Sequence, residues 1–124
     1  MQSPLAGGCL CGKVRFETNA EPLFSFQCYC RDCQHVSGGG HLPQFAVKRD
    51  ALAISGPVKA FRLKSDSGNE VENGFCSECG SPIYKTTTRA ADLIFLVPGS
   101  LDDPARYEPG RNVFEDRRLP WDKG

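Results

Sequence analysis

FCSECGSP, residues Phe75–Pro82, is the stretch that decides the fold of this 124-residue chain. In a C-x-x-C-G turn of this kind both thiolates point at one metal ion, and Gly80 lets backbone N–H groups reach the sulfur atoms. A lone C-x-x-C pair can instead be a redox site, but that alternative expects a βαβ context, which the surrounding sequence lacks. The stretch therefore predicts one half of a structural zinc site.

The other half is predicted at the C-x-C pair of Cys9 and Cys11, which glycines flank on both sides. Glycine suits a tight turn in which the backbone comes close to a metal. A zinc ion shared with the later C-x-x-C pair would join this first turn to a late hairpin and close a loop of more than half the chain. The four expected ligands of the structural zinc ion are Cys9, Cys11, Cys76 and Cys79.

A second cysteine cluster lies in QCYCRDCQHVS, residues Gln27–Ser37. Cys28, Cys30 and Cys33 form a C-x-C-x-x-C pattern. Such crowding suits metal ligation better than packing, because a divalent ion makes several adjacent thiolates tolerable. Three thiolates leave one corner of a tetrahedron free for a water or a substrate atom. We therefore predict that these three cysteines hold a catalytic zinc ion with an open position.

Two histidines follow this cluster, His35 and His41. Either side chain could supply a fourth ligand or an acid–base group, and either also suits a polar surface loop. If His35 closed the site, the open corner would disappear.

The number of cysteines also argues for metal rather than disulfides. There are seven, in three tight groups. An odd number cannot be fully paired, and a bridge between residues two positions apart would be strained. Met1–Gly8 has neither the basic nor the apolar region of a secretory signal, so we expect a cytoplasmic protein with two zinc sites.

Length and charge narrow the class of protein. A chain of this size suits a single domain, residues 1–124, with one modest core. Lys plus Arg and Asp plus Glu number 15 each, so the formal net charge is zero, which argues against nucleic acid and anionic membranes as partners. The longest apolar run, Leu93–Val97, is far shorter than the about 20 residues of a membrane-spanning helix.

Hydrophobic alternation predicts short strands along the chain, separated by Gly, Pro and polar turns. No window has a sustained helical period, and Arg31–Val36 suits one helical turn. We therefore predict an all-β fold of short antiparallel strands, with Trp121 covering apolar surface in a docked tail. The phenylalanines expected in the core are Phe24, Phe26, Phe45, Phe61, Phe75 and Phe95. The expected strands are residues 13–17, 23–28, 42–47, 51–55, 58–64, 71–75, 83–88, 92–97 and 111–115.

Three strings in this sequence resemble the glutathione-dependent formaldehyde-activating enzyme (GFA) family. They are GGCLCGKVRFE from Gly7, CYCRDCQHVSG from Cys28 and FCSECGSPIY from Phe75. The late segments Gly99–Pro104 and Arg118–Trp121 are also similar to the C-terminal segments of that family. The resemblance implies a zinc-pinned β-tent fold, in which sheets meet at the structural metal. It also implies the same division of the cysteines into four structural and three catalytic ligands.

The activity that this resemblance implies is addition of the thiol of glutathione to formaldehyde, a carbon–sulfur lyase reaction in the reverse sense. A small thiol and a small aldehyde would then be the partners. Zinc in the open site could hold the substrate thiol as thiolate and lower its pKa, or could polarise the aldehyde oxygen. We favour the first role, because three anionic thiolates weaken the Lewis acidity of the ion.

An alternative from a different class is a non-catalytic binding module with two structural zinc sites. A second zinc that exchanges readily and binds small thiols would favour the enzyme. Tyr29 stands between the first two cysteines of the open cluster, where the family often has His, so the pocket wall can differ there. The candidate cations for the carboxylates of glutathione are Arg31, Lys48, Arg49, Arg62 and Lys64.

Overall fold

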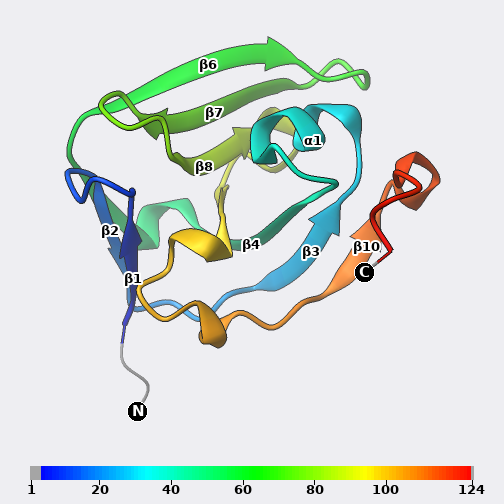
Figure 1. The fold of residues 1–124 in the computed structure, drawn as a ribbon. Helices are drawn as coiled ribbons and strands as arrows, with labels where there is room; N and C mark the ends of the chain where they lie inside the picture. Colours follow the sequence, from blue (N-terminus) through cyan, green and yellow to red (C-terminus); the bar gives the residue numbers. More distant parts are fainter. Residues whose placement is uncertain (1–3, 124) are drawn as a thin grey trace.

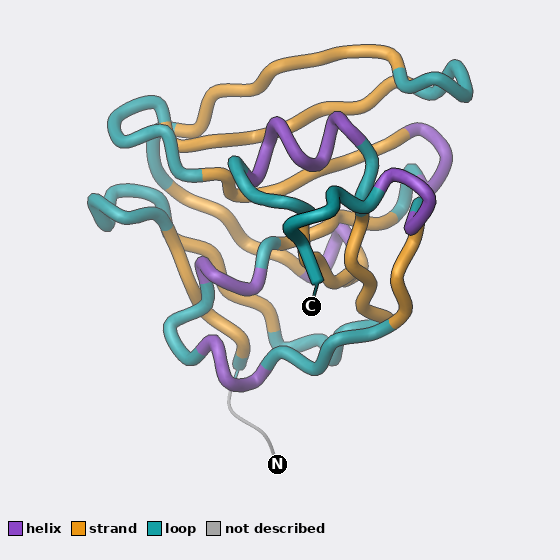
Figure 2. Tube along the Cα trace, turned by 45° about the vertical axis from the view of Figure 1, so that its right-hand side comes forward, coloured by secondary structure: helices purple, strands orange, loops and turns teal. Residues whose placement is uncertain are grey.

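Two β-sheets form the framework of the protein in a computed structural model, which describes residues 4–123 (Figure 1). Residues 1–3 and 124 of the expected domain 1–124, and with them the first part of Met1–Gly8, lie outside the described residues. The strands are β1 (Leu5–Gly8), β2 (Arg15–Thr18), β3 (Phe24–Cys28), β4 (Leu42–Lys48), β5 (Leu52–Ser55), β6 (Val58–Lys64), β7 (Glu70–Cys76), β8 (Pro82–Thr87), β9 (Leu93–Leu96) and β10 (Arg111–Val113). The helices are α1 (Arg31–Ser37) and the short 3-10 helices η1 (Arg49–Ala51), η2 (Thr88–Ala90), η3 (Pro98–Ser100), η4 (Pro104–Arg106) and η5 (Glu115–Arg117), which join strands or follow the last one (Figure 2).

The smaller sheet has the strand order β1-β2-β5, and the larger one has the order β10-β3-β4-β9-β8-β7-β6. Neighbouring strands are antiparallel except for β10, which pairs with β3 in parallel, from Arg111 opposite Phe26 to Val113 opposite Cys28. The last strand of the described chain therefore protects the edge of the sheet beside the first cysteine of the second cluster.

The main core contains side chains from both sheets. Phe16 on β2 clusters with Phe45 on β4, Ile83 on β8 and Leu96 on β9, and each of the four is at most 2% exposed. Burying one such side chain contributes about 1.5–3 kcal/mol. Cys76, at the end of β7, is fully buried in the same cluster, so one predicted zinc ligand is part of the core.

Helix α1 carries the second half of the C-x-C-x-x-C pattern. Cys30 is its N-cap, and the Cys30 sulfur accepts a hydrogen bond from the backbone N–H of Cys33. Gly38 ends the helix with φ 72°, a left-handed conformation that glycine adopts without strain. The helix lies between the β6–β7–β8 end and the β3–β10 end of the larger sheet (Figure 1). The helical turn predicted at Arg31–Val36 is therefore confirmed, with one residue more.

The predicted all-β fold of short antiparallel strands is confirmed, and β9 is a central strand as expected from its apolar run. Strand β1 was not predicted, because two of its four residues are glycines. At Gly7 a Cβ atom would lie 2.3 Å from the backbone oxygen of Ser100, so only glycine fits there. None of the helices in the described part of the chain is long and apolar enough to cross a membrane.

Three aromatic residues expected in contact with the core are exposed instead. Phe24 is 47% exposed, Phe61 is 62% exposed and Trp121 is 67% exposed. Phe61 lies on β6, an edge strand with no neighbour on its outer side, so half of its surroundings is solvent. Phe24 still contacts the rings of Phe26 and Phe95, each at a centroid distance of 6.1 Å.

Candidate metal centres

The four-cysteine cluster joins the β1–β2 turn of the smaller sheet to the β7–β8 turn of the larger one. Its Sγ atoms all lie within 4.8 Å of one another. The Sγ atom of Cys11 is 3.5 Å from that of Cys9 and 3.8 Å from that of Cys76. Zn–S bonds of about 2.3 Å place tetrahedral sulfurs about 3.8 Å apart, so the donor set fits one zinc ion. The predicted grouping of Cys9, Cys11, Cys76 and Cys79 is confirmed, and all seven cysteines are free of disulfides.

Both ligand pairs of this cluster lie in turns that contain a glycine with positive φ, Gly12 at 83° and Gly80 at 79°. The turns direct backbone N–H groups at sulfur. The backbone N–H of Glu78 donates to the Sγ atom of Cys76 at 3.4 Å. The backbone N–H of Val14 likewise donates to the Sγ atom of Cys9 at 3.2 Å. Such donors stabilise the negative charge of thiolate ligands.

Ser81 supports the fourth ligand. Its hydroxyl lies 3.2 Å from the Sγ atom of Cys79. Hydrogen bonds from this hydroxyl and from the Ser81 backbone lower the pKa of Cys79 to about 5. This shift of the pKa favours the thiolate, the form that binds metal.

The three-cysteine cluster lies where β3 ends and α1 begins. The Sγ atoms of Cys28, Cys30 and Cys33 lie within 4.8 Å of one another, and those of Cys28 and Cys30 are 3.3 Å apart. Cys28 and Cys33 are each 3% exposed, whereas Cys30 is half-buried. Three thiols in this arrangement fit zinc, and no fourth metal-binding side chain joins them within residues 4–123.

The two histidines take other partners. His35 is exposed, and its Nε2 atom lies 3.4 Å from the guanidinium of Arg31. His41 pairs through Nδ1 with Asp122 at 2.7 Å. Neither ring belongs to the group of sulfur atoms, so the alternative in which His35 closes the site does not describe this structure.

Cys30 is the thiol of the three-cysteine cluster that its surroundings favour as thiolate. Hydrogen bonds with Cys28 and then with Cys33 lower the pKa of Cys30, whereas hydrogen bonds with Cys28 and then with Cys30 raise the pKa of Cys33. A backbone N–H, that of Cys33, also donates to the Cys30 sulfur at 3.4 Å. Binding of a divalent ion would displace the remaining thiol protons, because metal ligands must be deprotonated.

A cavity of about 220 Å³ lies beside this cluster. Val36 and Leu42 belong to the cavity lining and also pack with Cys28 and Cys33. Gln44, which is 1% exposed, lines the cavity as well, and its Nε2 atom is 3.8 Å from the Sγ atom of Cys33. The cluster and the cavity therefore share a wall of side chains, although no cysteine among the described residues itself lines the cavity.

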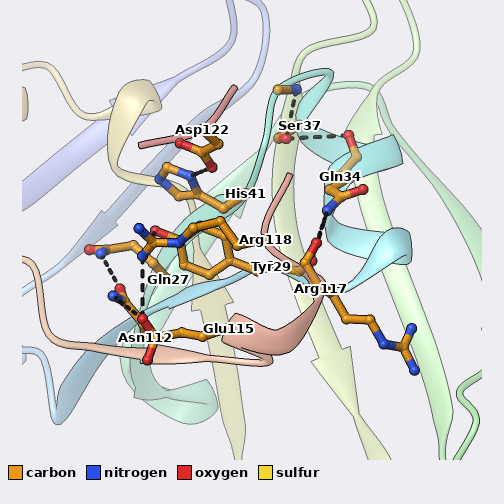
Figure 3. A network of polar contacts seen from close by, with 11 residues as sticks. Gln27, Tyr29, Gln34, Ser37, His41, Asn112, Glu115, Arg117, Arg118 and Asp122 are labelled. Carbon is orange, nitrogen blue, oxygen red and sulfur yellow. Dashed lines mark hydrogen bonds and ion pairs between the residues drawn. The ribbon is translucent and has the colours of Figure 1, made fainter. Parts of the chain in front are cut away.

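A polar network joins the residues after β10 to the segment that carries this cluster (Figure 3). Tyr29, between the first two cysteines, is 1% exposed. The guanidinium of Arg118 lies over its ring at 4.6 Å and donates to its hydroxyl at 3.1 Å. The ring of His41 lies 4.7 Å from that of Tyr29 and is bonded in turn to Asp122. The tail thus holds Tyr29 in place between two cysteines of the cluster.

Gln34 of α1 adds a second link to the tail. It is 4% exposed and donates to the backbone oxygens of Tyr29 at 2.9 Å and Arg117 at 3.1 Å. The docked tail that the sequence predicted is therefore present, but it docks through its backbone, Arg118 and Asp122 rather than through the indole of Trp121.

We expect Gly40→Ala to release this tail. A Cβ atom at Gly40 would lie 2.3 Å from Oδ2 and 2.7 Å from Cβ of Asp122, so the tail must move. Overpacking of this kind costs about 1–3 kcal/mol. Urea unfolding should show that loss, and the fluorescence anisotropy of Trp121, the single tryptophan, should fall.

Gly39→Ala is the matched control, because a Cβ atom there meets only the hydroxyl of Ser37, at 3.7 Å. Equal stability of the two variants would mean that the contact between Gly40 and Asp122 does not hold the tail.

Comparison with known families gives a match that covers most of the chain. A family model described as "Glutathione-dependent formaldehyde-activating enzyme" matches residues 4–117, which include both cysteine clusters. The chain belongs to this GFA family. The resemblance found in the sequence is thus confirmed, and the two clusters are sites that could hold the metal ions expected from it.

A solved structure supports the fold of this family member. It is the crystal structure of a Rhodobacter sphaeroides protein, a structural genomics target, with a TM-score of 0.67 and 16% sequence identity. The match covers 86% of the present chain and 98% of the other chain. At this identity the likeness concerns the fold alone. A search of curated proteins finds no match.

The structure also brings together residues that the sequence did not single out. Lys85 and Gln44 line the cavity beside the cluster, and neither was among the candidates. Of the candidate cations, Arg62 pairs with Glu72 at 2.8 Å and Arg49 donates to a backbone oxygen at 3.4 Å. No spacing in the sequence predicts Lys85, because its position depends on the pairing of β8 with β9.

Proposed function

We propose that the chain is a zinc-dependent enzyme of the carbon–sulfur lyase type that adds a small thiol, glutathione or a similar one, to formaldehyde or a related aldehyde. The observation that carries the proposal is the cluster of three cysteines beside a small cavity, in a chain of the GFA family. The four-cysteine cluster has a full ligand set and suits a structural role, whereas three ligands leave a position for substrate.

In this proposal Cys28, Cys30 and Cys33 hold the catalytic ion. When bound, zinc would supply a site that keeps the substrate thiol as thiolate at neutral pH. The residues of the chain orient the ligands: the N–H of Cys33 fixes the sulfur of Cys30, and the amide of Gln44 approaches the sulfur of Cys33. Phe26, Val36 and Val97 pack around the cluster and limit the access of water.

The proposed reaction is R–SH + HCHO → R–S–CH₂OH. The thiol sulfur forms a bond with the aldehyde carbon, the C=O double bond becomes a single bond, and the proton of the thiol ends on the oxygen. The balance needs no oxidant or reductant. A single domain that acts in the cytoplasm is part of the same proposal, which the length of the chain and the clustered cysteines support.

The test is exchange of isotope-labelled formaldehyde with glutathione, measured by NMR, because thiols also add to formaldehyde without a catalyst. Zinc-loaded protein should raise the exchange rate above the uncatalysed one, and Cys28→Ser should remove this excess. Ser77→Ala, which changes an exposed side chain that is not a metal ligand, should keep it. No excess in the wild type would leave the binding module as the function, and an excess retained in Cys28→Ser would exclude the cluster as the catalytic site.

A further inference from the structure

The cavity beside the three-cysteine cluster has one charged side chain in its lining. The walls come from α1, β4, β6, β7, β8, β9 and the residues that adjoin them. Most of the lining is apolar or aromatic, including Leu42, Phe61, Phe75 and Phe95. Lys85 of β8 is the single lysine, arginine or carboxylate in this lining among the described residues.

Lys85 is not neutralised by a carboxylate. Its ammonium group lies 5.8 Å from the centre of the Phe95 ring, and no salt bridge forms at Lys85 in the part of the chain that the structure describes. Glu72, which is opposite the next residue, Thr86, in the pairing of β7 with β8, has other partners: it accepts from the Tyr84 hydroxyl at 2.6 Å and from Arg62 at 2.8 Å. An anionic ligand would therefore meet a cation that has no competing ion pair.

Lys85 and the cluster are connected through residues that line the cavity with Lys85 and pack against the cysteines. Gln44 links the two geometrically, because it lines the cavity with Lys85 and directs its Nε2 atom at Cys33. The Oε1 atom of Gln44 is buried and has no hydrogen-bond partner among residues 4–123. An unpaired buried acceptor lowers stability, so the amide is not explained by packing alone.

The volume of the cavity limits the ligand. At about 220 Å³ it is smaller than the roughly 300–1000 Å³ of sites that enclose drug-sized molecules. A thiol with a short carbon chain and one carboxylate fits a cavity with an apolar wall, one cation and sulfur ligands at its side. Glutathione has two carboxylates, and most of the tripeptide would lie outside.

We propose that this cavity selects small thiols that carry a single carboxylate, with Lys85 binding the carboxylate and the thiol directed at Cys28, Cys30 and Cys33. The proposal rests on the proposed function and names its substrate class. Lys85 is then a specificity-determining residue, since its contact is with the non-reacting end of the substrate. Charge-assisted hydrogen bonds are about twice as strong as neutral ones, so the carboxylate should raise affinity about tenfold or more.

The experiment is calorimetric titration of the zinc-loaded protein with 3-mercaptopropionate and with its neutral analogue 3-mercaptopropionamide. The wild type should bind the acid about tenfold or more tightly than the amide. Lys85→Met should lose this preference and still bind the amide as the wild type does, because methionine keeps an apolar stem over Phe95. Lys59→Met, which removes an exposed lysine of β6 outside the cavity lining, should behave as the wild type.

Each of the other possible results would refute a stated part of the proposal. Equal binding of the two probes by the wild type would refute the carboxylate site and leave the proposed function standing, whereas no binding of either thiol would refute both. A preference that survives in Lys85→Met would mean that Lys85 does not bind the carboxylate. An equal loss of both probes in that variant, with an unchanged far-UV spectrum, would mean that Lys85 acts on the cluster and not on the carboxylate. Glutathione binding much tighter than 3-mercaptopropionate would refute the size limit.

Discussion

Cys76→Ser is expected to unfold the protein at room temperature. Cys76 is fully buried and belongs both to the main core and to the four-cysteine cluster. The apparent binding free energy of a structural zinc ion is about 10–16 kcal/mol, and the whole stability of a small domain is roughly 5–15 kcal/mol. Loss of this ion therefore removes as much free energy as the fold has. Far-UV circular dichroism and thermal melting should show an unfolded chain, both for this variant and for wild type stripped of metal.

Ser77→Ala is the control for this change, because the neighbouring side chain is exposed and is not a ligand. It should melt as the wild type does. A wild-type protein whose spectrum and melt are unchanged after all metal has been removed would falsify the structural role of the four-cysteine cluster.

Cys30→Ser should have a different result, namely the loss of one zinc ion from a chain that stays folded. Serine is a favoured N-cap residue and can accept the hydrogen bond from the N–H of Cys33 that the Cys30 sulfur accepts now. The helix α1 should therefore keep its cap, while zinc loses one of three soft ligands at this cluster. Elemental analysis should give two zinc ions per wild-type chain and one per variant chain, and glutathione binding should be lost.

Two results would contradict this expectation. One zinc ion per wild-type chain would mean that the three-cysteine cluster does not retain metal. Glutathione binding that does not depend on Cys30 would separate the cluster from the substrate and favour the binding module. Comparison of Cys76→Ser with Cys30→Ser thus assigns a structural and a functional role to the two clusters in separate measurements.

The grouping of the cysteines could be predicted from sequence, because ligands of one ion come as short-range pairs whose spacing is itself unusual. Cys76 and Cys79 form one such pair, and the structure brings them to the first pair as expected. Most strands could be predicted for a similar reason, because the alternation of apolar and polar residues is visible within a few neighbouring positions. On β2, for example, Phe16 is buried and its neighbours Arg15 and Glu17 are exposed.

The rest of the site depends on contacts between distant segments, for which the sequence has no local signal. Lys85 lines the cavity because β8 pairs with β9 and places it opposite Phe95. Phe61 is exposed on β6, which lies at the edge of the larger sheet. The alternation of apolar and polar residues predicts a strand but does not predict its position in the sheet. The identity of the bound ions and the catalytic role of the three cysteines stay predictions.

The parallel pairing of β10 with β3 has a consequence for biosynthesis. A chain emerges from the ribosome with its N-terminal part first. All ligands of the four-cysteine cluster have been synthesised once Cys79 is added. The edge of β3 stays uncovered until Arg111–Val113 have been synthesised as well. Arg118, which contacts Tyr29, is added later still. Unpaired edges invite association with other chains. We therefore expect nascent chains arrested between these two points to hold the first metal ion, to lack a finished second centre, and to aggregate through β3.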